Sequence, residues 1–303
     1  MPNKNIFCVN CESLTNNIIK YGKDSNNQQR YLCKECKRTF INDTTPFKNL
    51  KISEYTFKKF IGFMIDDTTM EVISRNLKLD IKSIHYYRFI VFKAIEDIQD
   101  SIKLNGSVII DETFIPIREL KYRIKKHDNK ETRGLSFNQL CIVTMIDLTG
   151  KSVAKATNRA MALPNHYVDS FTNNIGIVRE FIHDGNLRST QFMNQFKVDK
   201  INGRKDTTGN YSVDLIDHYH SNLKRYLFKH VGYKLKNVQY YLNFFVYRQN
   251  YLKSHEIRNM RDQNKVKNFM IEDLFKLIKK STKKINYKDY LKDKGIEKIL
   301  DIL

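Results

Sequence analysis

The sequence predicts a mixed α/β protein in which a small metal-bound module and a helical segment precede a sheet core. Three observations support this fold class. Two Cys-x2-Cys pairs lie in the first 36 residues, and apolar residues of 53–100 recur at helical spacing. From residue 107 onward, short β-rich runs alternate with helical stretches. We therefore expect four parts along the chain: 1–46, 47–104, 105–250 and 251–303.

Composition and charge indicate a folded protein with a polyanionic partner. The chain has 303 residues, of which 41% are hydrophobic, and only 11 Gly and 4 Pro, so most of it should fold. Its 53 Lys and Arg against 33 Asp and Glu give a net charge of +20, which favours binding to double-stranded DNA. A solvated Lys-rich surface is the alternative. No long apolar run or secretory start is present, so we expect a soluble cytoplasmic protein without a membrane partner.

The four N-terminal cysteines predict a zinc ribbon over 1–46. Cys8-x2-Cys11 and Cys33-x2-Cys36 are separated by 21 residues, a spacing that lets four thiolates bind one tetrahedral Zn²⁺. A segment this short buries too little surface to fold alone, so the metal would supply the missing free energy and be structural. Cys141 lies in the apolar run LCIVTMI and is predicted to be a buried strand residue rather than a ligand.

Residues 47–104 predict a helix-turn-helix segment. A short helix near 69–77, a tight turn and a helix opening near Asp80 have the lengths of that motif. Basic and aromatic residues also alternate in RYLCKECKRTF of the first part, which predicts either a DNA-backbone contact or a solvated basic face. The side chains expected on the DNA-reading helix are Ser83, His85, Tyr86 and Arg88.

Residues 105–250 predict the sheet core. SVIIDETFIPI and NQLCIVTMIDLTGKSVAKATN indicate three antiparallel strands with a hairpin turn at 147–150. A helix opening near Pro164, the strand of REFIHDGN, another helix and a short strand near 198–202 follow. Residues 213–250 are predicted to be helical, with the aromatic-rich 232–252 as a buried helix, and 251–303 to be a basic helical tail.

Two carboxylates are candidates for phosphoryl-transfer chemistry. Asp111 follows an apolar β-branched run in VIIDET, and Asp184 has the same local setting in FIHDGN. Carboxylates brought together from two strands can bind a pair of Mg²⁺ or Mn²⁺ ions, one activating the attacking oxygen and the other stabilising the leaving oxygen. Either aspartate alone could instead be a turn former or helix cap.

The third element is the predicted helix DLIDHYHSNLKRYLFKHVG. Its apolar stripe comprises Ile216, Tyr219, Leu223, Tyr226 and Leu227. Beside the stripe lie Asp217, His220 and Lys224. His220 could ligate a metal or orient a water, Asp217 could ligate or support a ligand, and Lys224 could contact a phosphate. A merely polar helix edge is the alternative interpretation.

The order of these motifs resembles the zinc-ribbon insertion-sequence transposases with a DDE-type, RNase H-like core. The motifs are the ribbon, the helical segment, VIIDETFI, RGLSFNQLCIVTMID, IHDGN and IDHYHSNLKRYL with GYKLKNVQYYLNFFVYRQN, which together span Cys8 to about Asn250. The resemblance implies that Asp111 and Asp184 are the first two metal-binding aspartates. It also implies cleavage and joining at terminal inverted repeats and assembly into at least a dimer on DNA.

The residues alone do not decide the identity of the third metal ligand, because Asp214, Asp217 and His220 can each take the position. The resemblance favours His220, placed where other branches of the family have Glu, with Asp217 beside it in the place of Asn.

Two other functions share parts of the pattern. A non-catalytic DNA-binding regulator would need only the ribbon and the helix-turn-helix, and a nuclease would share the metal chemistry without joining strands.

Overall fold

The computed structural model of the chain consists of two compact units, residues 1–51 with 279–284 and residues 52–278 with 285–303. The structure describes residues 8, 11, 17–23, 29–41, 52–117, 139–205, 213–230, 234–254, 257, 259–281 and 287–293. Some of the stretches discussed above lie outside these residues. They are parts of the predicted ribbon, the RGLSFN stretch of the resemblance and the end of the predicted tail.

The first unit is a small antiparallel sheet. Its strands β1 (Ile18–Lys23), β2 (Gln29–Cys33) and β3 (Thr39–Ile41) pair in the order β1-β2-β3. Among the described residues, its buried core consists of Cys8, Cys33 and Phe40. A core of this size cannot offset the conformational entropy of the ordered chain, so another source of stability is required.

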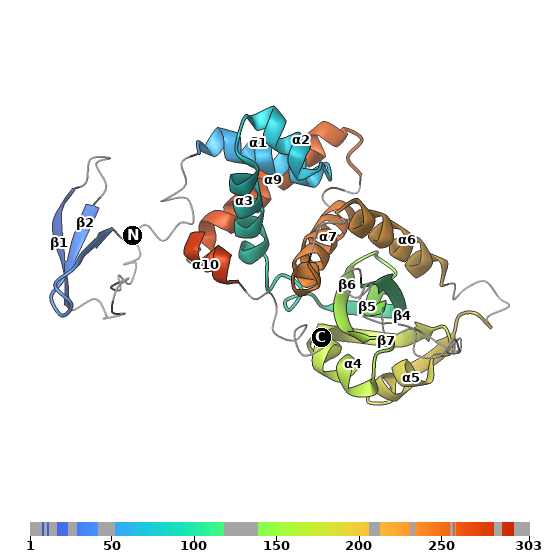
Figure 1. Ribbon diagram of the computed structural model, residues 1–303. Helices are drawn as coiled ribbons and strands as arrows, with labels where there is room; N and C mark the ends of the chain where they lie inside the picture. Colours follow the sequence, from blue (N-terminus) through green and yellow to red (C-terminus); the bar gives the residue numbers. More distant parts are fainter. Residues whose placement is uncertain are drawn as a thin grey trace, which may run out of the picture. The chain divides into compact units, whose positions relative to one another are not determined.

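The second unit begins with three helices, α1 (Glu54–Ile65), α2 (Met70–Leu77) and α3 (Ile81–Ala94) (Figure 1). Lys78 ends α2 in the left-handed conformation with a φ of 54°. Asp80 then caps α3, because its carboxylate accepts a hydrogen bond from the backbone N–H of Lys82 at 2.9 Å. The short helix, tight turn and second helix therefore occur where the sequence indicates them.

Two C-terminal helices, α9 (Gln263–Lys280) and α10 (Tyr287–Lys292), pack back onto α1 and α3. Lys58 of α1 forms an ion pair with Glu272 of α9 at 2.6 Å. The ring of Tyr86 on α3 contacts the rings of Tyr287 and Tyr290 at centroid distances of 5.3 and 5.7 Å. Part of the stretch expected as a basic tail thus packs on the helical segment, and Tyr86 of the expected reading helix lies against it.

The remainder of the second unit is built on a five-stranded mixed sheet with the order β6-β5-β4-β7-β8. β4 pairs antiparallel with β5, which pairs antiparallel with β6, whereas β4, β7 and β8 run parallel. The strands are β4 (Leu104–Pro116), β5 (Gln139–Asp147), β6 (Ser152–Arg159), β7 (Ile175–His183) and β8 (Asp199–Asn202). Three antiparallel strands followed by two parallel ones confirm the predicted RNase H-like mixed sheet core.

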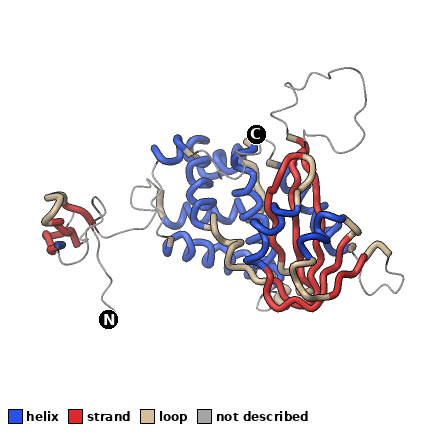
Figure 2. The backbone as a smooth tube through the Cα atoms, turned by 90° about the horizontal axis from the view of Figure 1, so that it is seen from below, coloured by secondary structure: helices blue, strands red, loops and turns tan. Residues whose placement is uncertain are grey.

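Helices cover both faces of this sheet (Figures 1 and 2). They are α4 (Pro164–Phe171) and α5 (Leu187–Met193) on one face, and α6 (Asp214–Lys229) and α7 (Val238–Lys253) on the other. Burial on both sides explains why the central strands read as continuous apolar runs rather than alternating ones. Cys141 is fully buried in β5, and the aromatic-rich helix α7 is buried along most of its length, as predicted.

Side-chain amides close the β6 edge of the sheet. The N–H and C=O of Ser152 pair with Asn250 of α7 at 2.8 and 2.9 Å. Gln99 pairs in the same way with Ala154 at 2.8 and 2.9 Å. Gln239 of α7 accepts from the N–H of Ala156 at 2.9 Å. These amides satisfy backbone groups that an edge strand would otherwise leave open, and they fix α7 against the sheet.

Candidate active site

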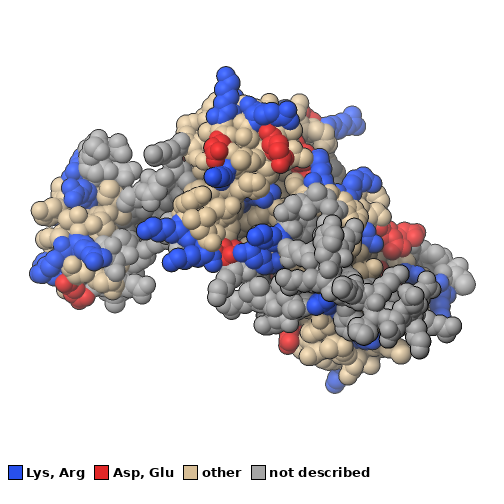
Figure 3. Space-filling view, in the orientation of Figure 1, with Lys and Arg blue, Asp and Glu red and all other residues tan. Residues whose placement is uncertain are grey.

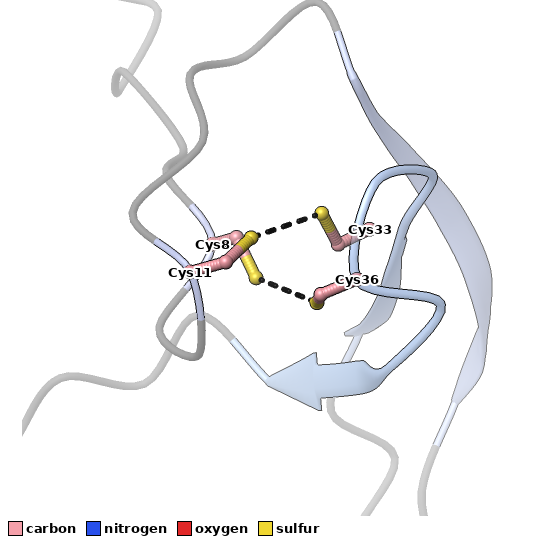
Figure 4. A group of neighbouring side chains, drawn as sticks. All are labelled: Cys8, Cys11, Cys33 and Cys36. Atoms are coloured by element: carbon pink, nitrogen blue, oxygen red, sulfur yellow. Dashed lines mark hydrogen bonds between the residues drawn. The ribbon is translucent and has the colours of Figure 1, made fainter.

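The first candidate metal site is formed by four sulfurs of the N-terminal unit (Figure 4). Cys33 ends β2 and Cys36 lies in the turn that follows it. Their Sγ atoms and those of Cys8 and Cys11 all lie within 4.8 Å of one another. The Cys8–Cys36 and Cys11–Cys33 sulfurs are each 3.6 Å apart. Tetrahedral Zn²⁺ at a Zn–S distance of about 2.3 Å would set sulfurs about 3.8 Å apart, so this arrangement fits zinc.

Backbone amides favour a thiolate at one of these cysteines. The N–H of Cys36 lowers the pKa of the Cys33 thiol by donating to its sulfur. The N–H of Arg38 lowers the pKa of Cys36, but burial and the other three sulfurs outweigh it and raise this pKa to about 12. Four thiolates this close cannot all ionise without a compensating cation, because like charges repel. A divalent cation bound by the four sulfurs would supply this compensation.

The second candidate site begins with Asp111 on the central strand β4. The parallel pairing of β4 with β7 ends at Ile110 and His183, so Asp111 on β4 and Asp184, the first residue after β7, directly follow the last paired positions. Neighbouring strands lie about 4.8 Å apart, and paired positions point to the same face. Asp111 was expected near the C-terminal end of its strand, but β4 continues to Pro116, and only its pairing with β7 ends before Asp111.

Helix α6 contributes the remaining groups. Its apolar stripe is buried as predicted: Ile216, Tyr219, Leu223, Tyr226 and Leu227. Asp217 is exposed, whereas His220 is buried with 7% of its side chain exposed. Lys224 lies one turn beyond His220 and is partly buried. The helix was expected to present all three polar residues on one flank, but His220 is drawn inward against the sheet.

Asp111, Asp217 and His220 converge. One ligand atom of each lies within 4.8 Å of the others, although 106 residues separate the first two along the sequence. Ligand atoms bound to one divalent ion at roughly 2.1–2.4 Å are at most about 4–5 Å apart, so the spacing fits such an ion. Asp184 is not part of this compact group, and neither is Asp214, which is exposed at the start of α6.

The electrostatics of Asp111 show that Asp184 nevertheless lies close by. Burial raises the pKa of Asp111 to about 7, against the lowering effect of the Glu112 N–H. The charges of Asp184 and Asp217 raise this pKa further, while Arg204 lowers it. Three carboxylates therefore influence one another, an arrangement that a divalent cation would stabilise.

His220 is present as a neutral imidazole. Burial, with a further contribution from Lys224, lowers its pKa to about 4. Its Nδ1 is 3.7 Å from Asp111 Oδ2, which is too long for a hydrogen bond, and a neutral ring cannot form an ion pair. Its Nε2 is buried without a hydrogen-bond partner among the described residues. A neutral ring nitrogen is the form that ligates metals.

Thr144 is a further polar residue at this site that sequence reasoning missed. It lies on β5 directly opposite Asp111, and its hydroxyl is fully buried without a hydrogen-bond partner among the described residues. Directly opposed residues of antiparallel strands share a face, with Cβ atoms about 5 Å apart. The available signal was the single hydroxyl that interrupts the apolar run CIVTMI. Buried unpaired polar groups are costly, so Thr144 and His220 both mark a place for a ligand or water.

Basic residues are exposed on both units. Lys34, Lys37 and Arg38 are exposed on the first unit. Lys and Arg side chains are spread over both units on the face shown in Figure 3, where Asp and Glu are fewer. Arg88 of α3, expected to face DNA, instead lies over the ring of Tyr241 at 5.2 Å. No helix within the described ranges is long and apolar enough to cross a bilayer.

Fold and sites together define an RNase H-like α/β core with a carboxylate–imidazole cluster, and a separate unit with a four-cysteine cluster. No family model and no curated protein matches the sequence. Among solved structures, a Mos1 transposase paired-end complex with left transposon end has 11% identity and a TM-score of 0.25, covering 70% of this chain and 80% of that one. A pre-cleavage Mos1 transpososome has 8% identity and a TM-score of 0.24, covering 77% and 82%. At these TM-scores the likeness establishes nothing by itself, and the fold rests on strand order and direction.

Proposed function

We propose that this protein is a DDE-type DNA transposase, which cleaves and joins DNA strands at the terminal inverted repeats of its own insertion element. One observation carries the proposal. Asp111, Asp217 and His220 gather beside Asp184 where the parallel β4–β7 pairing ends, in an RNase H-like sheet. The resemblance of the sequence motifs to zinc-ribbon insertion-sequence transposases points to the same chemistry.

In this proposal Asp111, Asp184 and His220 hold divalent cations, and Asp217 is a fourth ligand or supports His220. Two Mg²⁺ or Mn²⁺ ions bound there would activate the attacking oxygen and stabilise the leaving oxygen of a phosphodiester. The carboxylates supply the hard oxygen ligands, and His220 supplies a neutral nitrogen. Lys224, one turn further along α6, contacts a phosphate of the DNA as a point charge.

The other parts of the chain would bind DNA in this proposal. Residues 1–46 form a ribbon held by a structural Zn²⁺ at the four cysteines, and 47–104 form the helix-turn-helix that reads the element ends. Residues 105–250 form the catalytic core, and 251–303 follow as a basic helical part. The enzyme acts as a dimer or larger assembly on DNA, as the resemblance implies.

The test uses DNA fragments that carry the inverted repeats flanking the gene. We expect the protein with Mg²⁺ or Mn²⁺ to nick these ends and to join their 3′-hydroxyls to a target duplex. Asp111→Ala and Asp184→Ala should abolish both steps while binding to the ends persists. Activity that survives both substitutions would refute the assigned site. Binding without cutting by the wild type would favour the regulator, and cutting without joining would favour a nuclease.

A further inference from the structure

Glu112, the residue after Asp111, carries a second, partly buried carboxylate at the same place in the sheet. Side chains alternate between the faces of a strand, so Glu112 points to the α4–α5 face while Asp111 points toward α6. Its register partner on β5 is Val143, and burial raises the pKa of its carboxyl group. A carboxylate in this setting is costly unless hydrogen bonds satisfy it.

A hydrogen bond from one element and polar neighbours from another stabilise the Glu112 carboxylate. The hydroxyl of Tyr167, a fully buried residue of α4, donates to its Oε1. The side chain of Asn186 and the charge of Arg188 both lower the pKa of Glu112, so both lie close to its carboxylate. Asn186 is the residue that precedes α5. Glu112 therefore links the central strand to α4 and to the loop that leads into α5.

That loop is the turn that carries Asp184. The backbone N–H of Asn186 donates to Asp184 Oδ1 at 3.0 Å, and the side-chain oxygen of Asn186 accepts from the N–H of Arg188 at 3.0 Å. Between them, Gly185 has a φ of +98°, and a Cβ there would lie 2.8 Å from the side-chain nitrogen of Asn202. Asn186 thus holds Asp184 with its backbone, caps α5 with its side-chain oxygen and lies close enough to Glu112 to influence its carboxylate.

We propose that Glu112 is a positioning residue that anchors the 184–186 turn through Asn186 and thereby keeps the Asp184 carboxylate beside Asp111. This role rests on the proposed function, in which both aspartates hold the same cations. Residues that orient metal ligands from outside the ligand set commonly change metal affinity 10- to 100-fold when they are removed. Glu112 acts from the opposite face of the sheet and does not itself touch the cation.

The experiment compares Glu112→Ala with a matched control, Glu180→Ala. Glu180 is also a sheet carboxylate that accepts from a hydroxyl, that of Ser107, on the same β4–β7 strand pair, and it lies before the 184–186 turn. Mn²⁺ binding to the zinc-loaded full-length protein is measured by electron paramagnetic resonance titration without DNA. Hydrogen exchange of the peptide covering 184–188 is measured in the absence of Mn²⁺.

For Glu112→Ala we expect Mn²⁺ binding to weaken about tenfold or more and exchange at 184–188 to accelerate, while Glu180→Ala behaves like the wild type. Glu112→Gln, which keeps one acceptor oxygen for Asn186 and Tyr167, should lie closer to the wild type. Tyr167→Phe removes only one hydroxyl. It should weaken Mn²⁺ binding and accelerate exchange at 184–188, but less than Glu112→Ala does. It serves as the second test if Glu112→Ala does not fold.

Wild-type Mn²⁺ affinity and wild-type exchange in Glu112→Ala would overturn the positioning role and leave the proposed function standing. An equal loss of Mn²⁺ affinity in Glu112→Ala and Glu180→Ala would also overturn the positioning role, because the effect would then be a general weakening of the sheet. Absence of Mn²⁺ binding in the wild type itself would refute the proposed function, and the role of Glu112 with it.

Discussion

The two candidate metal sites of this chain are built in opposite ways. The four-cysteine cluster is formed by two Cys-x2-Cys pairs of a unit whose described buried core is two cysteines and one phenylalanine. The Asp111–Asp217–His220 cluster takes its ligands from a central strand and a helix of a large core, both covered by packed side chains. If both sites bind metals, we expect the metal to stabilise the fold of the first unit, and the fold of the second unit to hold its metal ligands in place. Metal removal and ligand substitution should therefore have opposite structural consequences in the two units.

The largest effect is expected for Cys33→Ser. Structural zinc contributes on the order of 10 kcal/mol to small modules of this kind, so the variant should lose its zinc and residues 17–41 should unfold. Elemental analysis gives the metal content, and hydrogen exchange gives the extent of unfolding. Cys141→Ala is the control, because Cys141 is buried in β5 and should leave the zinc in place. Full zinc retention in Cys33→Ser would contradict the assignment of zinc to the four cysteines.

The second prediction concerns the sheet edge that holds α7. Gln99→Leu would leave the N–H and C=O of Ala154 with fewer partners in a buried setting, which should cost about 2–4 kcal/mol of unfolding free energy. Chemical denaturation measures this loss. We expect the zinc content to be unchanged, because the amides act only within the core unit. A variant as stable as the wild type would mean that the amides do not hold the edge.

Asp111→Asn should have the reverse effect on the core. The wild-type carboxylate is buried and faces the charges of Asp184 and Asp217, so a neutral amide of equal size should stabilise the metal-free protein by about 1–2 kcal/mol. The same change should abolish Mn²⁺ binding and strand cleavage. Thermal unfolding without added divalent metal provides the measurement. A clear loss of stability would show that Asp111 supports the fold rather than a cation.

The smallest effect is expected for Lys224→Ala. This residue is partly buried at the flank of α6, and its proposed role is one phosphate contact. Binding to DNA should weaken about equally for all sequences, and the slope of log affinity against log salt should fall by about one. Fluorescence anisotropy over a salt series measures both quantities. An unchanged salt slope would remove Lys224 from the DNA interface.

The difference between the two candidate metal sites also explains which features could be predicted from the sequence. The four-cysteine cluster and the alternation of strands and helices follow from local spacing and periodicity, and the structure confirmed a mixed sheet with three antiparallel strands. The inward turn of His220 depends on how α6 meets the sheet, which no local pattern encodes. Thr144 opposite Asp111 depends on register, and the packing of α9 on α1 joins residues more than 200 positions apart.

The most direct test of the account is anomalous diffraction from crystals of the zinc-loaded protein soaked in Mn²⁺. We predict zinc at the sulfurs of the four N-terminal cysteines and manganese bound to Asp111, within ligand distance of His220 or Asp217. Manganese absent from Asp111, or found only among the sulfurs, would contradict a second, carboxylate-based metal site and the enzymatic function built on it.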